Sequence, residues 1–506
     1  MRIFTAEEMH KFDGRVINKV GIPEMVLMEN AGAAVAAVTE TLLEEVEDKM
    51  VVVLAGKGNN GGDGLVAARM LAAKGVDVTV VTLNPLKDFQ GSAGQELKIL
   101  KSFAVDIIPW TTGRDKQEAI KELCSCADLI IDAMLGTGFK GGLRGGYAEL
   151  VAELAGLPTP VVAVDIPSGV EADTGKCEKA LKAVVTVTMI APKLGLYLYP
   201  GASYAGEILV ANLQTPPEFL AEDAGEISTL EENMVRELLP QRPKNAHKGT
   251  NGHINIIAGS AGYAGAAELC SKAAVRAGGG LVSVYTDSDV WPILSVKSTE
   301  AMIHKLPTES LAEVIVTTLD ADVLAIGPGL GKAPEKQQMV RDLLPELGLP
   351  LVIDADGLNA LDGHEEILQE TAEKIITPHP GEMARLMHIS TGEVLQAPIE
   401  TALAAAKKWN AVVVLKCTPT LIALQSGRVF INTTGNEGMA TGGCGDVLTG
   451  IIAAFLGQGL TLENAAICGV YVQGLAGDLS AEKGKIGLRA GDLIEHLPEA
   501  INKIMG

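Results

Sequence analysis

The feature that most constrains this chain is a repeated alternation between short aliphatic runs and longer helical stretches. In the first part of the sequence, the runs fall at residues 50–54, 76–83, 128–133, 160–165 and 184–190. They are apolar throughout rather than alternately apolar and polar, as expected for parallel strands that helices cover on both faces. The pattern therefore predicts an α/β fold built on a parallel sheet.

A second series of the same kind fills the rest of the chain. Runs at residues 253–258, 281–286, 322–326, 351–354, 374–377 and 412–416 precede helical stretches at 446–456 and 462–478. Because 506 residues exceed one ordinary core and no short repeat is present, we expect two unlike domains, 1–215 and 228–506. Residues 212–227 contain two prolines and several acids and predict a linker, after which Ser228 is expected to cap a helix reaching Leu239.

Composition narrows the class of partner and the compartment. A formal net charge of −22 argues against a general nucleic-acid or anionic-membrane partner. The N-terminus is acidic where a signal peptide needs an apolar core, and no apolar run approaches the roughly 20 residues of a membrane span. We expect a cytoplasmic protein. Of seven cysteines, only Cys124 and Cys126 lie close together, which makes a zinc site improbable.

A glycine-rich loop follows the first predicted strand. Residues 56–64 contain five glycines together with Asn59, Asn60 and Asp63, and a helix follows. Glycines at the start of a helix let backbone N–H groups approach a phosphate closely. The alternative is a merely tight turn between strand and helix, but the two asparagines beside Asp63 favour a ligand site.

Polar residues also end three further strands of the first series. Asp132, Asp165 and Lys193 stand at these ends. Ligands of open parallel sheets bind beyond the carboxyl ends of the strands, so we expect these loops to converge on one crevice. Oxygen atoms of Asn60, Asp132 and Ser168 could ring a hard cation, although spacing alone does not establish a metal.

The second half contains another glycine-rich turn, at residues 438–445, which runs into Asp446 and an apolar helix. Such a turn forms a nest of backbone donors at the positive end of a helix, where an anion binds. A carboxylate there competes with the anion, so we interpret Asp446 as a base that takes the proton of a hydroxyl attacking a phosphoryl group. The alternative is that Asp446 only caps its helix.

Three other strand ends of the second series contain residues that could bind a nucleotide or a substrate. Lys416 to Thr420 offer a cation and two hydroxyls to nucleotide phosphates. Glycines at 327–331 end a second strand, and His379, held between two prolines, follows a third. A lone histidine is often structural, but its place at a strand end favours contact with a substrate.

The motifs AGKGNNGGDG, DAMLGTG, VDIPSGV and APKLG resemble those of the NAD(P)H-hydrate epimerases across most of residues 1–212. The resemblance implies a Rossmann-like three-layer sandwich and a potassium ion held by Asn60, Asp132 and Ser168. Asp165 is our candidate for proton transfer, with a purely ligand-binding role as the open alternative. The implied contacts with the hydrated nucleotide are Asn59, Asn60, Gly61, Gly62, Asp63, Gly136, Thr137, Gly138, Phe139, Lys140, Gly141, Gly142 and Asp165.

From about residue 228 onward, the strand-end motifs resemble the ADP- or ATP-dependent NAD(P)H-hydrate dehydratases, a branch of the ribokinase-like fold. One departure is Glu437, where relatives usually have proline. The resemblance implies Mg²⁺ bound with ADP or ATP. It places hydrate contacts at Gly262, Gly329, His379 and Asp446, and nucleotide contacts at Lys416, Cys417, Thr418, Pro419, Thr420 and Gly445.

Together the halves predict a bifunctional enzyme that repairs hydrated nicotinamide nucleotides. One half would interconvert the R and S epimers, and the other would dehydrate the S form by phosphorylating its hydroxyl. The alternative is a ribokinase-like small-molecule kinase fused to a nucleotide-binding or protein-interaction module. We expect small-molecule substrates and a homo-oligomer; the choices between ADP and ATP and between NADH and NADPH hydrates stay open.

Overall fold

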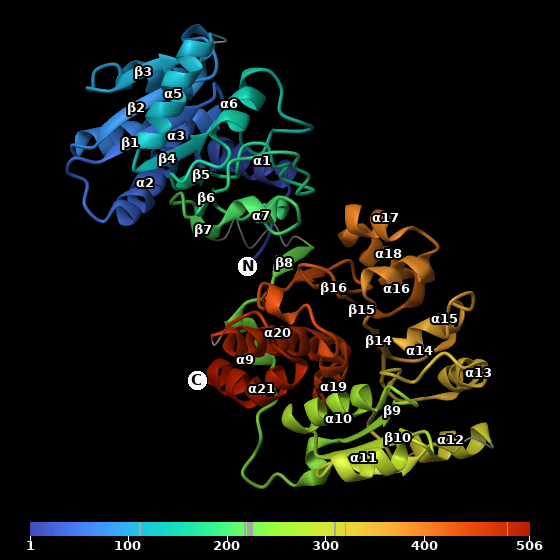
Figure 1. Cartoon of the computed structure of the whole chain (residues 1–506). Coiled ribbons are helices and arrows are strands. Elements are labelled where there is room, and N and C mark those ends of the chain that lie inside the picture. The colour runs from blue at the N-terminus through green and yellow to red at the C-terminus, as the bar shows by residue number, and fades with distance from the viewer. Residues whose placement is uncertain (111–112, 217–218, 220–225, 308–309, 319, 483) are drawn as a thin grey trace. The chain divides into compact units, whose positions relative to one another are not determined.

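A computed structural model describes residues 1–110, 113–216, 219, 226–307, 310–318, 320–482 and 484–506. The chain forms two compact units, Arg2–Gly225 and Glu226–Gly506 together with Met1, which we describe separately (Figure 1). Of the predicted linker, residues 217–218 and 220–225 lie outside the described residues.

A seven-stranded parallel sheet forms the centre of the first unit, with strand order β3-β2-β1-β4-β5-β6-β7. Five of its strands lie where the aliphatic runs predict them. The strands are β1 (Met50–Ala55), β2 (Asp77–Thr82), β3 (Asp106–Pro109), β4 (Leu129–Ala133), β5 (Val161–Val164), β6 (Val185–Met189) and β7 (Glu207–Ala211).

Helices cover both faces of this sheet, which makes a three-layer sandwich (Figure 1). Alternate residues of β1 separate the two cores: Val51 and Val53 pack against α2, α3 and α4, whereas Val52 and Leu54 pack against α5 and α6. The helices are α1 (Ala6–Arg15), α2 (Glu24–Leu43), α3 (Asn59–Ala73), α4 (Gly91–Leu100), α5 (Arg114–Cys126), α6 (Gly146–Leu154) and α7 (Ala202–Ala205).

Among the described residues, α2 is the one helix long and apolar enough to cross a membrane, judged by length and composition alone. The expectation that no apolar run approaches this length was therefore wrong. Leu27, Ala31 and Val35 of α2 are buried in the core that also contains α3. We therefore interpret α2 as a core helix, because its apolar side is already covered by protein.

The second unit contains a ten-stranded sheet of order β11-β10-β9-β12-β13-β14-β15-β16-β17-β8. Its pairs are parallel except where β16 runs against β15 and β17. The strands are β8 (Ile227–Thr229), β9 (His253–Ile257), β10 (Leu281–Thr286), β11 (Met302–Lys305), β12 (Val323–Ile326), β13 (Leu351–Ile353), β14 (Lys374–Ile376), β15 (Val412–Leu415), β16 (Leu421–Ala423) and β17 (Val429–Ile431).

One face of this sheet packs against α10, α19, α20 and α21, and helices such as α18 cover β15 and β16 elsewhere (Figure 1). The helices of the unit are α9 (Glu232–Leu238), α10 (Ala264–Arg276), α11 (Trp291–Lys297), α12 (Leu311–Thr318), α13 (Pro334–Leu343), α14 (Asp356–Asn359), α15 (Ile367–Glu370), α16 (Pro380–Met387), α17 (Thr391–Gln396), α18 (Pro398–Trp409), α19 (Cys444–Gly457), α20 (Leu462–Ala481) and α21 (Ala490–Met505).

The predicted helix cap at Ser228 was wrong. Ser228 lies in β8, where it pairs with Phe430 of β17, and α9 begins only after Glu231. The short strands β8, β16 and β17 lie at one edge of the sheet and have three residues each. Runs this short give no periodic signal, so their pairing is decided by tertiary contacts.

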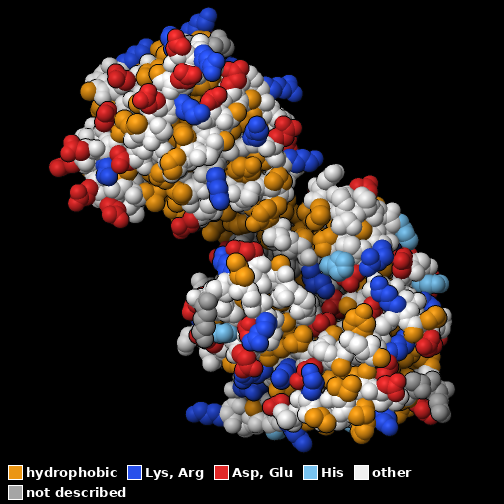
Figure 2. Space-filling model, in the orientation of Figure 1, with side chains coloured by type: hydrophobic (Ala, Val, Ile, Leu, Met, Phe, Trp, Pro, Cys, Tyr) orange, Lys and Arg blue, Asp and Glu red, His pale blue; other side chains and the backbone are white. Residues whose placement is uncertain are grey.

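Charged side chains of both signs are interspersed over the visible face of both units (Figure 2). The acidic excess of the sequence is therefore not gathered into one continuous patch on this face. A mixed surface of this kind favours solubility rather than the attraction of one highly charged partner.

The close contact between α10 and α19 in the second unit predicts how a substitution there changes the free energy of unfolding. A Cβ atom on Gly450 of α19 would lie 2.1 Å from the carbonyl oxygen of Cys270 in α10. Gly450→Ala should therefore lower the free energy of unfolding by about 1–3 kcal/mol, although alanine favours a helix by about 1 kcal/mol. Calorimetry of the second unit's transition measures this, with Gly491→Ala of α21, which meets no described neighbour, as the control. Equal stability of the two variants would contradict the prediction.

Candidate active sites

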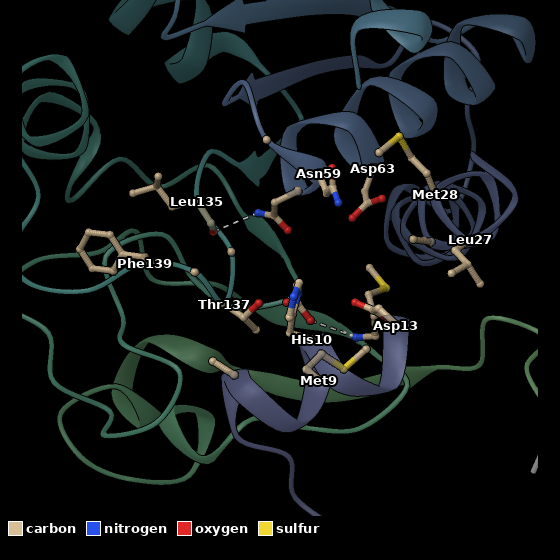
Figure 3. A pocket seen from close by; sticks show the side chains of 18 of the residues that line it. Met9, His10, Asp13, Leu27, Met28, Asn59, Asp63, Leu135, Thr137 and Phe139 are labelled. Atoms are coloured by element: carbon tan, nitrogen blue, oxygen red, sulfur yellow. Dashed lines mark hydrogen bonds between the residues drawn. The ribbon is translucent and has the colours of Figure 1, made fainter. Parts of the chain in front are cut away.

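A cavity of about 810 Å³ opens at the carboxyl ends of the strands in the first unit (Figure 3). Its walls come from α1, α2, the start of α3 and the loops that follow β4, β5 and β6. The predicted convergence of strand-end loops is confirmed for Asn59, Asn60, Asp63, Gly136, Thr137, Gly138, Phe139, Lys140, Asp165 and Lys193, which all line this cavity.

The glycine-rich loop brings backbone close to backbone at the start of α3. A Cβ atom on Gly61 would lie 1.7 Å from the carbonyl oxygen of Gly56, so only glycine fits there. The helix begins at Asn59, whose amide donates to Glu24 of α2 at 2.9 Å. The positive end of α3 thus faces the cavity, as an anionic group of a nucleotide requires.

Asp165 stands at the floor of the cavity and is held by several donors. Its Oδ1 accepts from the Nζ atom of Lys193, which is fully buried, from the hydroxyl of Thr188 at 3.2 Å and from the backbone N–H of Met189 at 3.2 Å. Asp165 also adopts a left-handed backbone, with φ of 65°. The carboxylate is therefore fixed in orientation rather than free to rotate.

The three residues of the implied potassium site lie together beneath the loop that follows β4. The hydroxyl of Ser168 donates to Asp132 at 2.5 Å and accepts from the backbone N–H of Leu135 at 2.9 Å. Asn60 donates to the carbonyl of Leu135 at 3.0 Å, while its Oδ1 atom is buried without a partner among the described residues. Amide, carboxylate, hydroxyl and carbonyl oxygens suit a hard cation, so this donor set fits potassium.

Other predicted residues of this half do not line the cavity. Gly62 packs against Met28, and the N–H of Gly141 donates to Glu171 at 2.8 Å. Within the described chain, the predicted residues that do not line the cavity are Gly61, Gly62, Asp132, Gly141, Gly142 and Ser168.

In the second unit, Asp446 is the third residue of α19. The N-cap of this helix is Gly443, with φ of 97°, and it has no side chain with which to cap. Asp446 therefore lies inside the first turn rather than at the cap position, and the helix start has no side-chain capping hydrogen bond that would support the capping alternative. The N–H groups at the start of α19 are left to face an anion.

An ion pair with a buried aspartate lies against this helix start. The Nζ atom of Lys416, at the end of β15, donates to Asp354 at 2.5 Å, and the hydroxyl of Thr449 donates to the same carboxylate at 2.8 Å. Asp354 is 1 % exposed. A Cβ atom on Gly445 would lie 3.2 Å from that Nζ atom, so the lysine charge stands directly at the glycine turn.

The charges around Asp446 set its protonation. Burial, together with the charges of Asp354 and Asp356, raises the pKa of the Asp446 carboxyl to about 6 against the opposing charge of Lys416. A carboxyl with a pKa near 6 is a stronger base than an exposed aspartate and is still ionised at neutral pH.

Two further predicted loops meet beside this carboxyl. The hydroxyl of Ser260, after β9, donates to the carbonyl of Gly329 at 2.8 Å, and the N–H of Gly331 donates to Asp356 at 2.8 Å. A Cβ atom on Gly329 would lie 2.8 Å from the carbonyl of Tyr263, next to Gly262. The glycines thus let the loops after β9 and β12 approach each other.

The surroundings of His379 and Cys417 indicate which roles these two predicted contacts can have. His379 is the N-cap of α16: its Nδ1 atom accepts from the N–H of Gly381 at 2.9 Å, while half of the side chain stays exposed. Structural capping and substrate contact are both compatible with this position. Burial raises the pKa of Cys417 to about 12, so its thiol stays protonated.

Sequence reasoning missed several residues of these sites, above all Asp354, Asp356 and Asp13. Asp354 and Asp356 directly follow β13 and precede Gly357. The same signal, an acidic residue at a strand end with glycine after it, was the reason to choose Asp132 and Asp165 as candidates in the first unit. Asp13 lines the first cavity from α1, where no strand end or glycine motif marks it.

Comparison with solved structures defines the class of the second unit. A ribokinase-like superfamily protein of Enterococcus faecalis is 30% identical, with a TM-score of 0.50 over 55% of this chain and 96% of that protein. An ADP/ATP-dependent NAD(P)H-hydrate dehydratase of Bacillus subtilis, crystallised with ATP and Mg²⁺, is 30% identical with a TM-score of 0.50 over 56% of this chain and all of that protein. The second unit is therefore a ribokinase-like α/β domain.

Sequence comparison covers both halves. Residues 254–499 match the family described as NAD(P)H-hydrate dehydratase, and residues 24–195 match the YjeF-related N-terminal family. A bifunctional NAD(P)H-hydrate repair enzyme of Moorella thermoacetica is 40% identical over the whole of this chain and 97% of its own length. The Escherichia coli enzyme of that name is 34% identical over 99% of this chain and 94% of its own length.

The chain belongs to the family of bifunctional NAD(P)H-hydrate repair enzymes. It unites an NAD(P)H-hydrate epimerase with an ADP/ATP-dependent NAD(P)H-hydrate dehydratase, which confirms the predicted fold and function.

The ion pair predicts the pH dependence of the dehydratase. Asp354 raises the pKa of Asp446, so Asp354→Asn should lower that pKa and move the loss of turnover on acidification below pH 6. It should also lower the free energy of unfolding by about 3 kcal/mol, because Lys416 loses its partner. A turnover profile between pH 4.5 and 8 tests the shift, with exposed Glu366→Gln as the control. An unchanged acidic limb in Asp354→Asn would contradict the electrostatic role.

Proposed function

We propose that Asp446 is the general base of the dehydratase and that it acts on a phosphoryl transfer. The observation that carries this proposal is the position of Asp446 at the start of α19, with a pKa of about 6, beside the glycine turn and the Lys416 charge. A base and an anion site that share one helix end suit the attack of a hydroxyl on a phosphoryl group.

The chemistry follows from the poor leaving ability of hydroxide. Asp446 takes the proton of the hydrate hydroxyl as that oxygen attacks the terminal phosphoryl group of ADP or ATP, whose phosphoanhydride bond breaks to release AMP or ADP. The resulting ester departs as inorganic phosphate, pushed by the lone pair of the ring nitrogen, and loss of a ring proton restores the dihydropyridine. Hydrate contacts are assigned to Gly262, Gly329, His379 and Asp446.

The nucleotide is assigned to the end of β15 and the start of α19. Its contacts are Lys416, Cys417, Thr418, Pro419, Thr420 and Gly445, with Mg²⁺ bound through the phosphates, as supported by the Bacillus subtilis dehydratase crystallised with ATP and Mg²⁺. When bound, Mg²⁺ would supply neutralisation of phosphate charge. Lys416 is anchored by Asp354 and therefore presents a fixed charge rather than a mobile one.

We assign the epimerase to the first domain, residues 1–215, and the dehydratase to residues 228–506. In the epimerase, Asn60, Asp132 and Ser168 would hold K⁺, which stabilises negative charge next to the loop after β4 when bound. The loop residues Gly136, Thr137, Gly138, Phe139, Lys140, Gly141 and Gly142 and the helix start Asn59, Asn60, Gly61, Gly62 and Asp63 would bind the hydrated nucleotide, with Asp165 at the reacting ring. We also propose that the enzyme works in the cytoplasm and that it is a homo-oligomer. Sedimentation would test the oligomeric state.

Replacement of the proposed base gives the most direct test. Asp446→Asn should bind ADP or ATP normally but lower dehydratase turnover about a hundredfold or more, the usual scale for a general base. Recovery of the reduced-nicotinamide absorbance measures turnover, and Asp342→Asn on the exposed side of α13 is the control. A wild-type rate in Asp446→Asn would refute the assignment.

The same assay separates the dehydratase from a plain kinase. A kinase would leave a stable phosphorylated product, whereas the dehydratase releases one inorganic phosphate for each dihydropyridine restored. Phosphate release is therefore measured beside the absorbance.

The potassium assignment predicts a salt-specific effect. Asn60 supplies the buried amide oxygen that has no partner among the described residues, so Asn60→Ala should weaken activation of the epimerase by K⁺ about tenfold or more. Titration with KCl at constant ionic strength, balanced with choline chloride, measures this by chromatography of the two epimers. Dehydratase turnover in the same sample is the internal control. Equal potassium curves for the variant and the parent would rule this site out.

A further inference from the structure

The epimerase cavity has one wall whose titratable groups have no role in the scheme above. Helix α1 contributes Met9, His10 and Asp13 to the lining, and Figure 3 shows His10 and Asp13 beside the same space as Asp63. Asp13 is the carboxyl of this wall, and none of the motifs that identify the two domains includes it.

The position of Asp13 is fixed by the packing of its helix. Thr5 and Glu8 form a capping box at the start of α1, and Phe12, which is 1 % exposed, meets Phe4 edge to face. Met9 is buried four residues before Asp13, on the same side of the helix. Core packing therefore holds the Asp13 carboxyl at the cavity, as a reacting group requires.

The charges that act on Asp13 come from several walls of the cavity. They are His10 on α1, Glu24 on α2, and Asp165 and Lys193 at the ends of β5 and β6. Burial raises the pKa of Asp13 to about 6, because its effect and those of Asp165 and Glu24 outweigh the opposing Lys193 and His10. Asp13 also helps to raise the pKa of Asp63 on α3, whose largest cause is likewise burial.

Asp13 and Asp165 differ in what their oxygens already bind. Oδ1 of Asp165 accepts from Lys193, Thr188 and Met189, so this carboxylate is anchored. Asp13 instead sits beside the lysine charge with a pKa of about 6 and is able to hold or release a proton near neutral pH. The anchored group suits orientation of the substrate, and the second suits proton transfer.

We propose that Asp13 is a catalytic acid–base residue of the epimerase, a role that rests on the assignment of the epimerase to this cavity. Protonated Asp13 gives its proton to the hydroxyl of the hydrate, the C–O bond breaks, and water leaves with the bonding pair. The ring-nitrogen lone pair forms a C=N⁺ bond. Water then attacks the opposite face, the π pair returns to nitrogen, and the proton released by that water goes back to Asp13.

The test uses the full-length enzyme and measures epimer interconversion by chromatography, with the spontaneous rate in buffer subtracted at each pH. Asp13→Asn should lower kcat about a hundredfold with little change in KM. In the parent, the rate should fall as pH rises through about 6, because the acid form is needed, and the variant's residual rate should lack this fall. Asp13→Glu should retain the fall with a reduced kcat.

Controls separate catalysis from folding. Glu7→Gln, on the exposed side of the same helix, should keep the parent rate, and dehydratase turnover should be unchanged in every variant. If Asp13→Asn does not fold, Asp13→Ser is measured in its place, with the same expected loss. A parent-like kcat and pH profile in either folded variant would overturn the proposal, as would a pH limb that disappears in Asp63→Asn but not in Asp13→Asn. A parent enzyme without epimerase activity would instead refute the assignment of the domain.

Discussion

A lysine paired with a buried aspartate stands at the carboxyl edge of each sheet, and each active site depends on the charge balance that this pair sets. In the first unit the pair is Lys193 with Asp165, and in the second it is Lys416 with Asp354. Removing two charges from water is costly, so such pairs persist where their hydrogen bonds are satisfied. Both pairs have such additional hydrogen bonds. The hydroxyl of Thr188 donates to Asp165, and the hydroxyl of Thr449 donates to Asp354.

The two pairs act on a neighbouring carboxyl in the same way. Asp446 lies beside the second pair and Asp13 beside the first, and the pKa of each is raised to about 6. In both places burial is the largest cause, the aspartate of the pair adds to it, and the lysine opposes it. Two unlike folds thus share one arrangement, in which an anchored ion pair tunes a separate carboxyl, the group that we propose for proton transfer.

The sequence was a good guide where a local pattern carries the physics. Aliphatic runs located most central strands, and glycines at a strand end located both helix starts and Asp446. It failed at Ser228 and at the short edge strands, where pairing partners lie far away in the chain. It also failed at Asp13, because a helical residue acquires its role only when folding places its helix beside Lys193, which lies 180 residues later in the sequence.

The backbone contact between α10 and α19 has a consequence for how this enzyme tolerates change. Each helix begins at the dehydratase site, α10 after Gly262 and α19 at Gly443, and Gly450 brings α19 against the carbonyl of Cys270 in α10. At the point where Gly450 meets Cys270, the spacing of the two helices is thus set by main chain rather than by side-chain volume. Volume-conserving exchanges among the surrounding aliphatic residues are tolerated best in such a core, so its sequence can vary while the contact between α10 and α19 keeps its spacing.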